Sequence, residues 1–149
     1  MRYTRNAGRR NTGFTLMELM VVMSIIAILA TAVTLELTNQ SKKARRARAL
    51  QDVKTLETAV DLYAQDNGQP PTTQQGLDAL RVRPTAPPVP TNWNGPYIKK
   101  RPLDPWSMPY EYRSPGTINP EGYDIVCYGA DSKPGGADWD ADITNSDEE

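Results

Sequence analysis

The feature that most constrains this chain is one uncharged apolar run near its amino terminus. Residues 19–35 are seventeen consecutive residues without a charge, enclosed by Glu18 and Glu36. As an α-helix the run is roughly 25 Å long at ~1.5 Å per residue, near the lower limit for crossing a bilayer. The remainder is hydrophilic enough to bring the mean hydropathy to -0.60. The pattern predicts a membrane-inserted helix followed by a water-exposed region.

The flanks of the apolar run predict its orientation and leave its processing open. The positive-inside rule keeps the amino end in the cytoplasm and sends the chain after about residue 37 outward, because four arginines precede the run: Arg2, Arg5, Arg9 and Arg10. An ordinary cleaved signal peptide is one interpretation, since Ala30-Thr31-Ala32 has the form of a leader-peptidase site. An uncleaved membrane anchor is the second. Neither explains Glu18, a carboxylate at the edge of the apolar run, where charge is costly and usually functional.

Composition excludes several classes of catalytic site. The chain contains no histidine and one cysteine, Cys127. It therefore has no Ser-His-Asp triad, no histidine-ligated zinc, no internal disulfide and no four-cysteine metal cluster. It also has no Gly-x-x-x-x-Gly-Lys loop for nucleotide phosphates. A net charge of -1 indicates no nucleic-acid partner. We expect a protein that is not an enzyme.

Beyond the apolar run, the hydrophobic pattern is that of an amphipathic helix. One apolar stripe recurs at intervals of three or four residues: Leu50, Val53, Leu56, Val60 and Tyr63. No glycine or proline interrupts residues 14–67, so one helix of about 50 residues is predicted, ending at Asn67-Gly68. The base-rich stretch 42–48 (KKARRAR) is expected to form a solvated collar near lipid head groups or an acidic neighbour.

The following residues predict a small α+β head. Residues 72–80 have the pattern of a short helix, with Thr72 or Thr73 as its N-cap. Residues 110–113 and 123–128 are β-prone, and the turn-rich residues 114–122 between them predict an antiparallel pair. Two strands need a cover, which the amphipathic half of the long helix can provide. Cys127, inside the second strand, is expected to be buried as an apolar residue.

Acidic residues gather near the carboxyl end. Asp131, Asp138, Asp140 and Asp142 lie within twelve residues, interspersed with Gly135 and Gly136. Carboxylate oxygens on a flexible loop suit Ca2+, which takes ~6–8 oxygen ligands. Without a cation these carboxylates would repel one another. An acidic, solvated tail is the alternative interpretation.

The residues around the start of the apolar run resemble the type IV prepilin leader. The stretch 11–18 (NTGFTLME) has a glycine, then an aromatic residue, then a glutamate at the fifth position from that aromatic. The resemblance implies cleavage between Gly13 and Phe14 by a prepilin peptidase, and N-methylation of Phe14. It assigns Glu18 to assembly, where the Phe14 amine of a neighbouring subunit neutralises the carboxylate. Leu35 stands where many pilins have a proline.

Three further tracts resemble one branch of that superfamily. They are PTTQQGL at 71–77, YIKK followed by DPW at 97–106, and YDI, GAD and DI between 123 and 143. Together with the leader they resemble the major pseudopilins of type II secretion systems, the protein G family of the general secretory pathway. The resemblance implies a pilin-like fold in which a Ca2+ ion stabilises the C-terminal loop. It adds main-chain oxygens of Tyr128 and Gly136 to the aspartate ligands.

The expected organisation is a leader at 1–13, a transmembrane and filament-core helix at 14–38, and a periplasmic head at 39–149. The resemblance implies a single-pass inner-membrane precursor that polymerises into a periplasmic pseudopilus, driving export of folded proteins across the outer membrane. Implied partners are further copies of the chain, minor pseudopilins, and the inner-membrane assembly platform with its ATPase. One alternative is a type IV pilin. The other is a signal-anchored periplasmic Ca2+-binding protein or an enzyme tethered to the inner membrane.

Overall fold

One long helix runs through much of the chain. The computed structural model describes residues 13–146, apart from the side chains of residues 31–37. Helix α1 (Leu16–Asn67) is 52 residues long, which confirms the predicted helix of about 50 residues. The chain divides into two compact units, Met1–Gln40 and Ser41–Glu149, and α1 contributes to both. The second unit is called the head below.

The first unit consists of the amino-terminal half of α1 and the residues before it. The Glu18 amide donates a hydrogen bond of 3.2 Å to the Thr15 hydroxyl, so Thr15 is the N-cap of α1. The large apolar side chains described between Leu16 and Leu29 are exposed. In the described part of the chain, no helix reaches the combined length and hydropathy of a membrane span. The end of the predicted apolar run, including Leu35, lies among the side chains that the structure does not describe. The same holds for Thr31 and Ala32 of the predicted leader-peptidase site.

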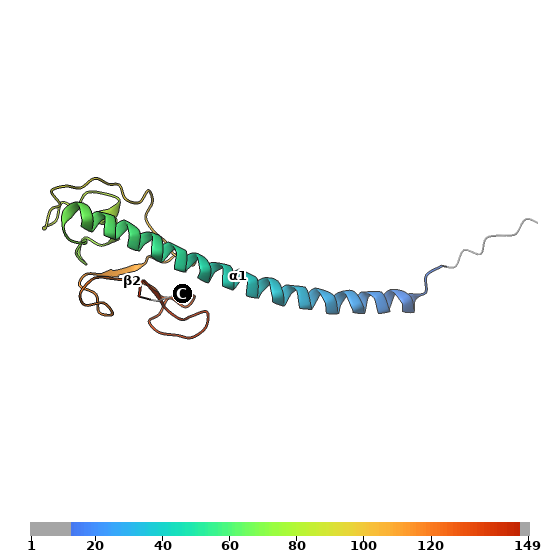
Figure 1. Cartoon of the computed structure of the whole chain (residues 1–149). Helices are drawn as coiled ribbons and strands as arrows, with labels where there is room; N and C mark the ends of the chain where they lie inside the picture. Colours follow the sequence, from blue (N-terminus) through green and yellow to red (C-terminus); the bar gives the residue numbers. More distant parts are fainter. Residues whose placement is uncertain (1–12, 147–149) are drawn as a thin grey trace, which may run out of the picture. The chain divides into compact units, whose positions relative to one another are not determined.

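The head contains a small antiparallel sheet beside the second half of α1 (Figure 1). Its strands are β1 (Glu111–Arg113), β2 (Asp124–Cys127) and β3 (Ile143–Thr144), in the order β1-β2-β3. Tyr112 pairs with Ile125, and Cys127 pairs with Ile143. The predicted pair is confirmed with slightly shorter strands. Strand β3 was not predicted from the sequence, because it is only two residues long.

The core of the head joins the apolar stripe of α1 to the sheet. Val53, Leu56, Val60 and Tyr63 of the predicted stripe are buried, and Leu50 packs partly buried against them. The sheet contributes Ile125, Cys127 and Ile143. Fully burying a side chain of this size contributes roughly 1.5–3 kcal/mol relative to exposure. This packing sets the position of the sheet on α1 and confirms the α+β fold.

The short helix expected at 72–80 is shorter than predicted. The structure has a 3-10 helix, η1 (Leu77–Leu80), preceded by Gly76, which has a φ of 59° and makes no side-chain cap. Thr72 instead caps the preceding turn: its hydroxyl accepts from the Gln75 amide, and the Gln75 side chain accepts from the Thr72 amide. The predicted cap therefore exists, but it closes a turn and not the helix. The positive φ at Gly76 separates that turn from η1.

Candidate functional site

The predicted cleavage site lies directly before α1. Gly13, Phe14 and Thr15 are outside regular secondary structure, and α1 begins at Leu16. The Phe14 side chain is 78% exposed. Glu18 is exposed in the first turn of α1, where the helix dipole favours a carboxylate. The structure thus places all three residues of the predicted processing and assembly site at the amino end of one helix.

The acidic segment forms a closed loop between β2 and β3, called the acidic loop (residues 129–142). The Ala130 amide donates to the Trp139 carbonyl at 3.2 Å, which brings the two ends of the loop together. Gly129 and Gly136 both have positive φ, and at each position a Cβ would collide with the backbone of Asp140. Close backbone approach therefore requires glycine at both positions, whereas the sequence pattern indicated only a flexible loop.

The four aspartates have different surroundings in the acidic loop. Asp131 accepts from the Lys133 amide at 3.1 Å, and Asp142 accepts from the Gly135 amide at 2.8 Å through Oδ2. Asp138 and Asp140 are exposed, and Asp138 has a φ of 54°. Within residues 13–146, no three carboxylate or thiol side chains gather closely enough to form a metal site by themselves. The structure does not bring the predicted four-aspartate set together.

The oxygen atoms of the acidic loop nevertheless suit a hard cation in type. The second carboxylate oxygen of Asp142, Oδ1, is buried and has no hydrogen-bond partner. Such an atom is costly unless something compensates it. Carboxylate and carbonyl oxygens on a loop are the donors that Ca2+ prefers. The residues therefore fit Ca2+ by donor chemistry, with Asp142 as the carboxylate that most needs a ligand.

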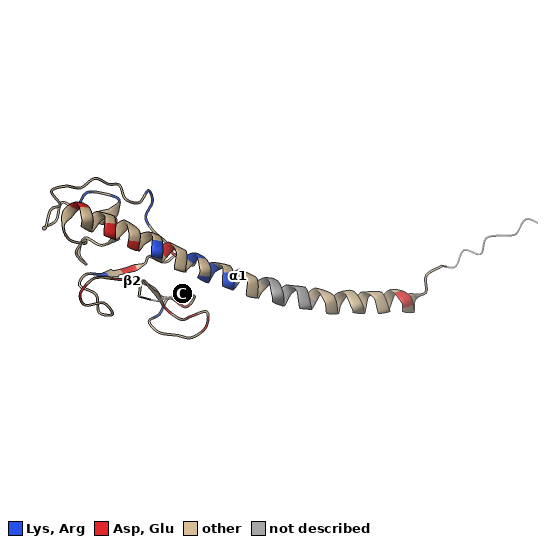
Figure 2. Cartoon of the chain, viewed as in Figure 1, with Lys and Arg blue, Asp and Glu red and all other residues tan. Residues whose placement is uncertain are grey.

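An arginine from α1 also reaches the acidic loop. Nη1 of Arg46 donates to the carbonyl oxygens of Asp138 at 3.4 Å and Ala141 at 3.0 Å. Figure 2 shows the Lys and Arg residues gathered along one stretch of α1, with Asp and Glu on the turns that follow. An acidic neighbour for stretch 42–48 was one of the two expectations from the sequence, but Arg46 was not singled out within the stretch. The spacing contained no signal, because Arg46 and the loop are more than 90 residues apart.

Three tyrosines of the head donate hydrogen bonds to aspartates on α1. The pairs are Tyr110 with Asp52 at 3.2 Å, Tyr123 with Asp61 at 2.6 Å and Tyr97 with Asp66 at 2.6 Å. Burial, followed by the neighbouring carboxylate, raises the pKa of each of these three phenols above its ordinary value. These phenols stay neutral donors over the physiological range, so they tie three segments that follow α1 back to the helix.

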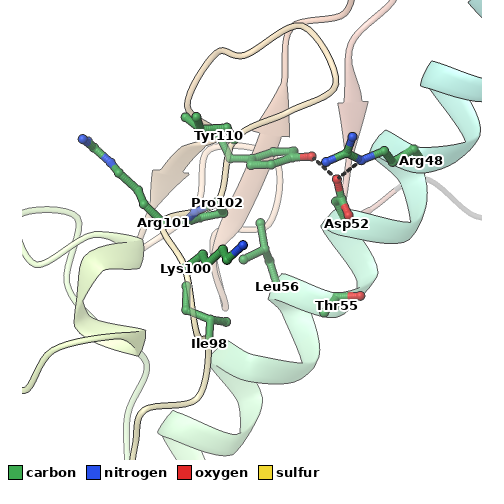
Figure 3. A pocket seen from close by; sticks show the side chains of 10 residues that line it. Arg48, Asp52, Thr55, Leu56, Ile98, Lys100, Arg101, Pro102 and Tyr110 are labelled. Atoms are coloured by element: carbon green, nitrogen blue, oxygen red, sulfur yellow. Dashed lines mark hydrogen bonds and ion pairs between the residues drawn. The ribbon is translucent and has the colours of Figure 1, made fainter.

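A cavity of about 330 Å³ lies between α1 and residues 98–103. Arg48 and Tyr110 both point at Asp52 (Figure 3), with the Arg48 Nε 3.5 Å from its carboxylate. Leu56 and Ile98 form apolar walls of the cavity. The Asp52 carboxylate is already bound by Arg48 and Tyr110. The arrangement is that of a contact between α1 and the segment that precedes β1.

Asp124, at the start of β2, organises the connection from β1. Asp124 is 1% exposed. It accepts four hydrogen bonds: three from the amides of Thr117, Ile118 and Asn119, and one from the Thr117 hydroxyl. Burial alone would raise the pKa of Asp124, but these donors outweigh it and hold the pKa below its ordinary value. Asp124 therefore has a structural role, in closing residues 117–119 onto the sheet.

Cys127 behaves as the sequence predicted. It is 1% exposed, and its thiol contacts the Asp104 carboxylate at 3.6 Å. Burial raises the pKa of the thiol to about 11. A neutral, buried thiol is unreactive at physiological pH.

Two family models together match most of the chain. Residues 36–146 match the model of type II secretion system protein G, and residues 8–34 match the prokaryotic N-terminal methylation motif. The type II secretion system core protein G of Pseudomonas aeruginosa is 47% identical over 140 residues, covering 93% of this chain and 97% of that protein. The protein of the same name from Vibrio cholerae is 44% identical over 138 residues, covering 92% of each.

A solved structure resembles the fold. It is the crystal structure of the major pseudopilin from the type 2 secretion system of enterohaemorrhagic Escherichia coli, with a TM-score of 0.62 and 37% sequence identity. The match covers 73% of this chain and 92% of that one.

Proposed function

The chain belongs to the protein G family of type II secretion systems and is a subunit of the pseudopilus; from this premise we propose how its two ends serve assembly. Residues 1–13 are a leader that a prepilin peptidase removes, and the same enzyme methylates the new amine of Phe14. The head then lies in the periplasm while the apolar half of α1 lies in the inner membrane. Assembly withdraws that helix from the lipid into a filament of identical subunits.

The observation that carries this proposal is the difference between the two units. The head completes a core from its own residues, with Val60 and Ile125 fully buried. In the first unit, the large apolar side chains described along α1 are exposed. Exposed apolar surface of this extent marks contact with a membrane or with other proteins. Lipid before assembly and neighbouring copies after assembly supply that contact.

The placement of the cleavage site supports removal of the leader. The Gly13–Phe14 bond precedes the first turn of α1, and the Phe14 side chain is exposed. A peptidase therefore reaches the bond without unwinding the helix. Cleavage creates an amine four residues before Glu18, and in a filament the amine of one copy neutralises the Glu18 carboxylate of the next. Subunits meet head-to-tail, an arrangement that gives an open filament.

Several partners follow from this role. Besides further copies of the chain, we infer contacts with minor pseudopilins and with the inner-membrane assembly platform, whose ATPase supplies the energy. The chain itself has a structural role and no catalytic one. Export of folded proteins across the outer membrane is the process that the filament drives.

Calcium is the cofactor that we propose for the head. Asp142 and Asp131 would hold Ca2+ through their carboxylates, with main-chain oxygens near Tyr128 and Gly136, while Asp138 and Asp140 would contribute charge. Ca2+ supplies a charge that compensates the buried Oδ1 of Asp142. Bound Ca2+ would stabilise the acidic loop and fix its shape.

The first experiment is the intact mass and amino-terminal residue of the chain isolated from its native membrane. We expect a chain that begins with N-methylated Phe14. A chain that begins at Val33, or that still begins at Met1, would contradict filament assembly by this route.

Two variants separate leader recognition from folding. Gly13 has no neighbouring atom within 4 Å of a Cβ position, so Gly13→Ala leaves the chain's own structure intact. Accumulation of the uncleaved form in this variant would reflect the peptidase alone. In Glu18→Gln, cleavage should continue while filaments fail to form, because the carboxylate that attracts the neighbouring amine is gone. Normal filaments from Glu18→Gln would refute the assembly role.

A further inference from the structure

The acidic loop is held on α1 by one side chain of the base-rich stretch. Arg46 is half-buried, whereas Arg45 and Arg48 are exposed. Arg48 pairs with Asp52 on its own helix. Arg46 instead donates from a single nitrogen to two carbonyl oxygens of the loop, those of Asp138 and Ala141. Arg46 thus has a partner that the rest of the stretch does not share.

The two carbonyls bracket the most constrained part of the loop. Between Asp138 and Ala141 lies Asp140, whose backbone is in close approach to Gly129 and Gly136. A guanidinium that bonds both carbonyls holds this turn as a unit, with charge-assisted hydrogen bonds. The carbonyl oxygens of Asp138 and Ala141 are also engaged by Arg46, so they are unfavourable candidates for a cation's ligand set.

The residue after Ala141 is the carboxylate with an unpaired buried oxygen. Asp142 uses Oδ2 to accept from the Gly135 amide, and this bond leaves Oδ1 buried without a partner. Fixing the Ala141 carbonyl on α1 restricts the backbone at Asp142. The orientation of the Asp142 carboxylate therefore depends on the contact between Arg46 and the Ala141 carbonyl, which involves no other carboxylate and no cation.

We propose that Arg46 is a positioning residue: it docks the acidic loop onto α1 and thereby presets Asp142 for a divalent cation. The docking part rests only on the contacts above, and the cation part rests on the calcium site proposed for the head. Arg46 is a permanent positive charge at the loop, so the loop stays docked when Ca2+ is absent. Ca2+ then binds a loop that is already ordered, which reduces the entropy lost on binding.

The test compares Arg46→Gln with Arg45→Gln in the full chain in detergent micelles. Both changes remove one arginine from the same stretch, but only Arg46 contacts the loop. Hydrogen exchange of residues 129–146 is measured in chelator, and the affinity for Ca2+ alone is measured by titration calorimetry. We expect about tenfold faster exchange of the loop amides and about tenfold weaker Ca2+ binding for Arg46→Gln, from the loss of two charge-assisted bonds.

The outcomes separate docking from calcium binding. Equal hydrogen exchange of the loop in the two variants would overturn the docking role of Arg46. Tighter Ca2+ binding by Arg46→Gln would show that Arg46 opposes the cation, and it would overturn the positioning role. Faster loop exchange together with no Ca2+ binding by the unmodified chain would support docking while refuting the calcium site. Partial rescue by Arg46→Lys would support the contact with the carbonyls, and unchanged exchange across β2 would show that the variant head is folded.

Discussion

Replacing Asp124 by asparagine tests whether a buried carboxylate holds the connection between β1 and β2. The carboxylate accepts four hydrogen bonds, and three of them come from consecutive backbone amides of Thr117, Ile118 and Asn119. Asparagine keeps the size of the side chain but replaces one oxygen by an NH2 group. At least one donor then faces another donor, and the remaining bonds lose the charge of their acceptor.

The size of the effect follows from the bond types. A hydrogen bond to a charged group contributes about 1.5–3 kcal/mol and a neutral one about 0.5–1.5 kcal/mol. Because the bonds share one side chain, their losses are not additive. We expect Asp124→Asn to lower the free energy of unfolding by about 3 kcal/mol, which lowers the Tm of a head of this size by more than about 10 °C.

The assay is thermal unfolding of the full chain in micelles, followed by the fluorescence of its three tryptophans, all of which lie in the head. The control is Asp78→Asn, since Asp78 is exposed and its ion pair with Arg81 is long, at 3.7 Å. The control should change stability by less than about 0.5 kcal/mol.

The pH dependence gives an independent check on the same carboxylate. Because the pKa of Asp124 is lowered in the folded head, the unfolded state takes up the proton first as the pH falls. The stabilisation is fully present above the ordinary carboxyl pKa of about 3.9 and is lost as the pH falls toward the folded value. The difference between the unmodified chain and Asp124→Asn should therefore be constant from pH 7 to about pH 5 and shrink below about pH 4. A difference below about 0.5 kcal/mol at pH 7, or one independent of pH, would refute the reasoning.

Three further changes test the core, the acidic loop and the helix contacts by the same unfolding assay. Ile125→Ala should cost about 2–5 kcal/mol, because Ile125 is 0% exposed at the centre of the core; a smaller loss would mean that the cavity collapses. Gly136→Ala should destabilise the acidic loop more than Gly135→Ala, because both have positive φ but only Gly136 meets the Asp140 backbone, and equal effects would contradict that close approach. Tyr123→Phe should cost about 0.5–1.5 kcal/mol, because the phenol's hydrogen bonds to the exposed Asp61 carboxylate and the Glu57 carbonyl are lost, and no change would mean that water replaces the phenol.

The sequence alone determined the long helix, its carboxyl end and the family. Helix α1 could be predicted because its signals are local: an apolar stripe repeats at helical spacing, and Asn67-Gly68 interrupts it. The tracts around Gly13 and at 71–77 identified the family in the same way, since each is a continuous stretch. Strands β1 and β2 were predicted from short β-prone runs on either side of a turn.

The tertiary structure alone decided which distant groups meet. Ile143 and Thr144 form β3 because the free edge of β2 pairs them, and two residues contain too little pattern to predict a strand. Arg46 meets the Ala141 carbonyl across 95 positions of sequence, and such contacts arise only when the helix packs on the sheet. The four aspartates of the acidic loop lie within twelve residues of sequence, yet within residues 13–146 the fold does not gather three of them into one site. Spacing along a chain specifies local periodicity, whereas contacts between a helix and a loop depend on how separate elements pack.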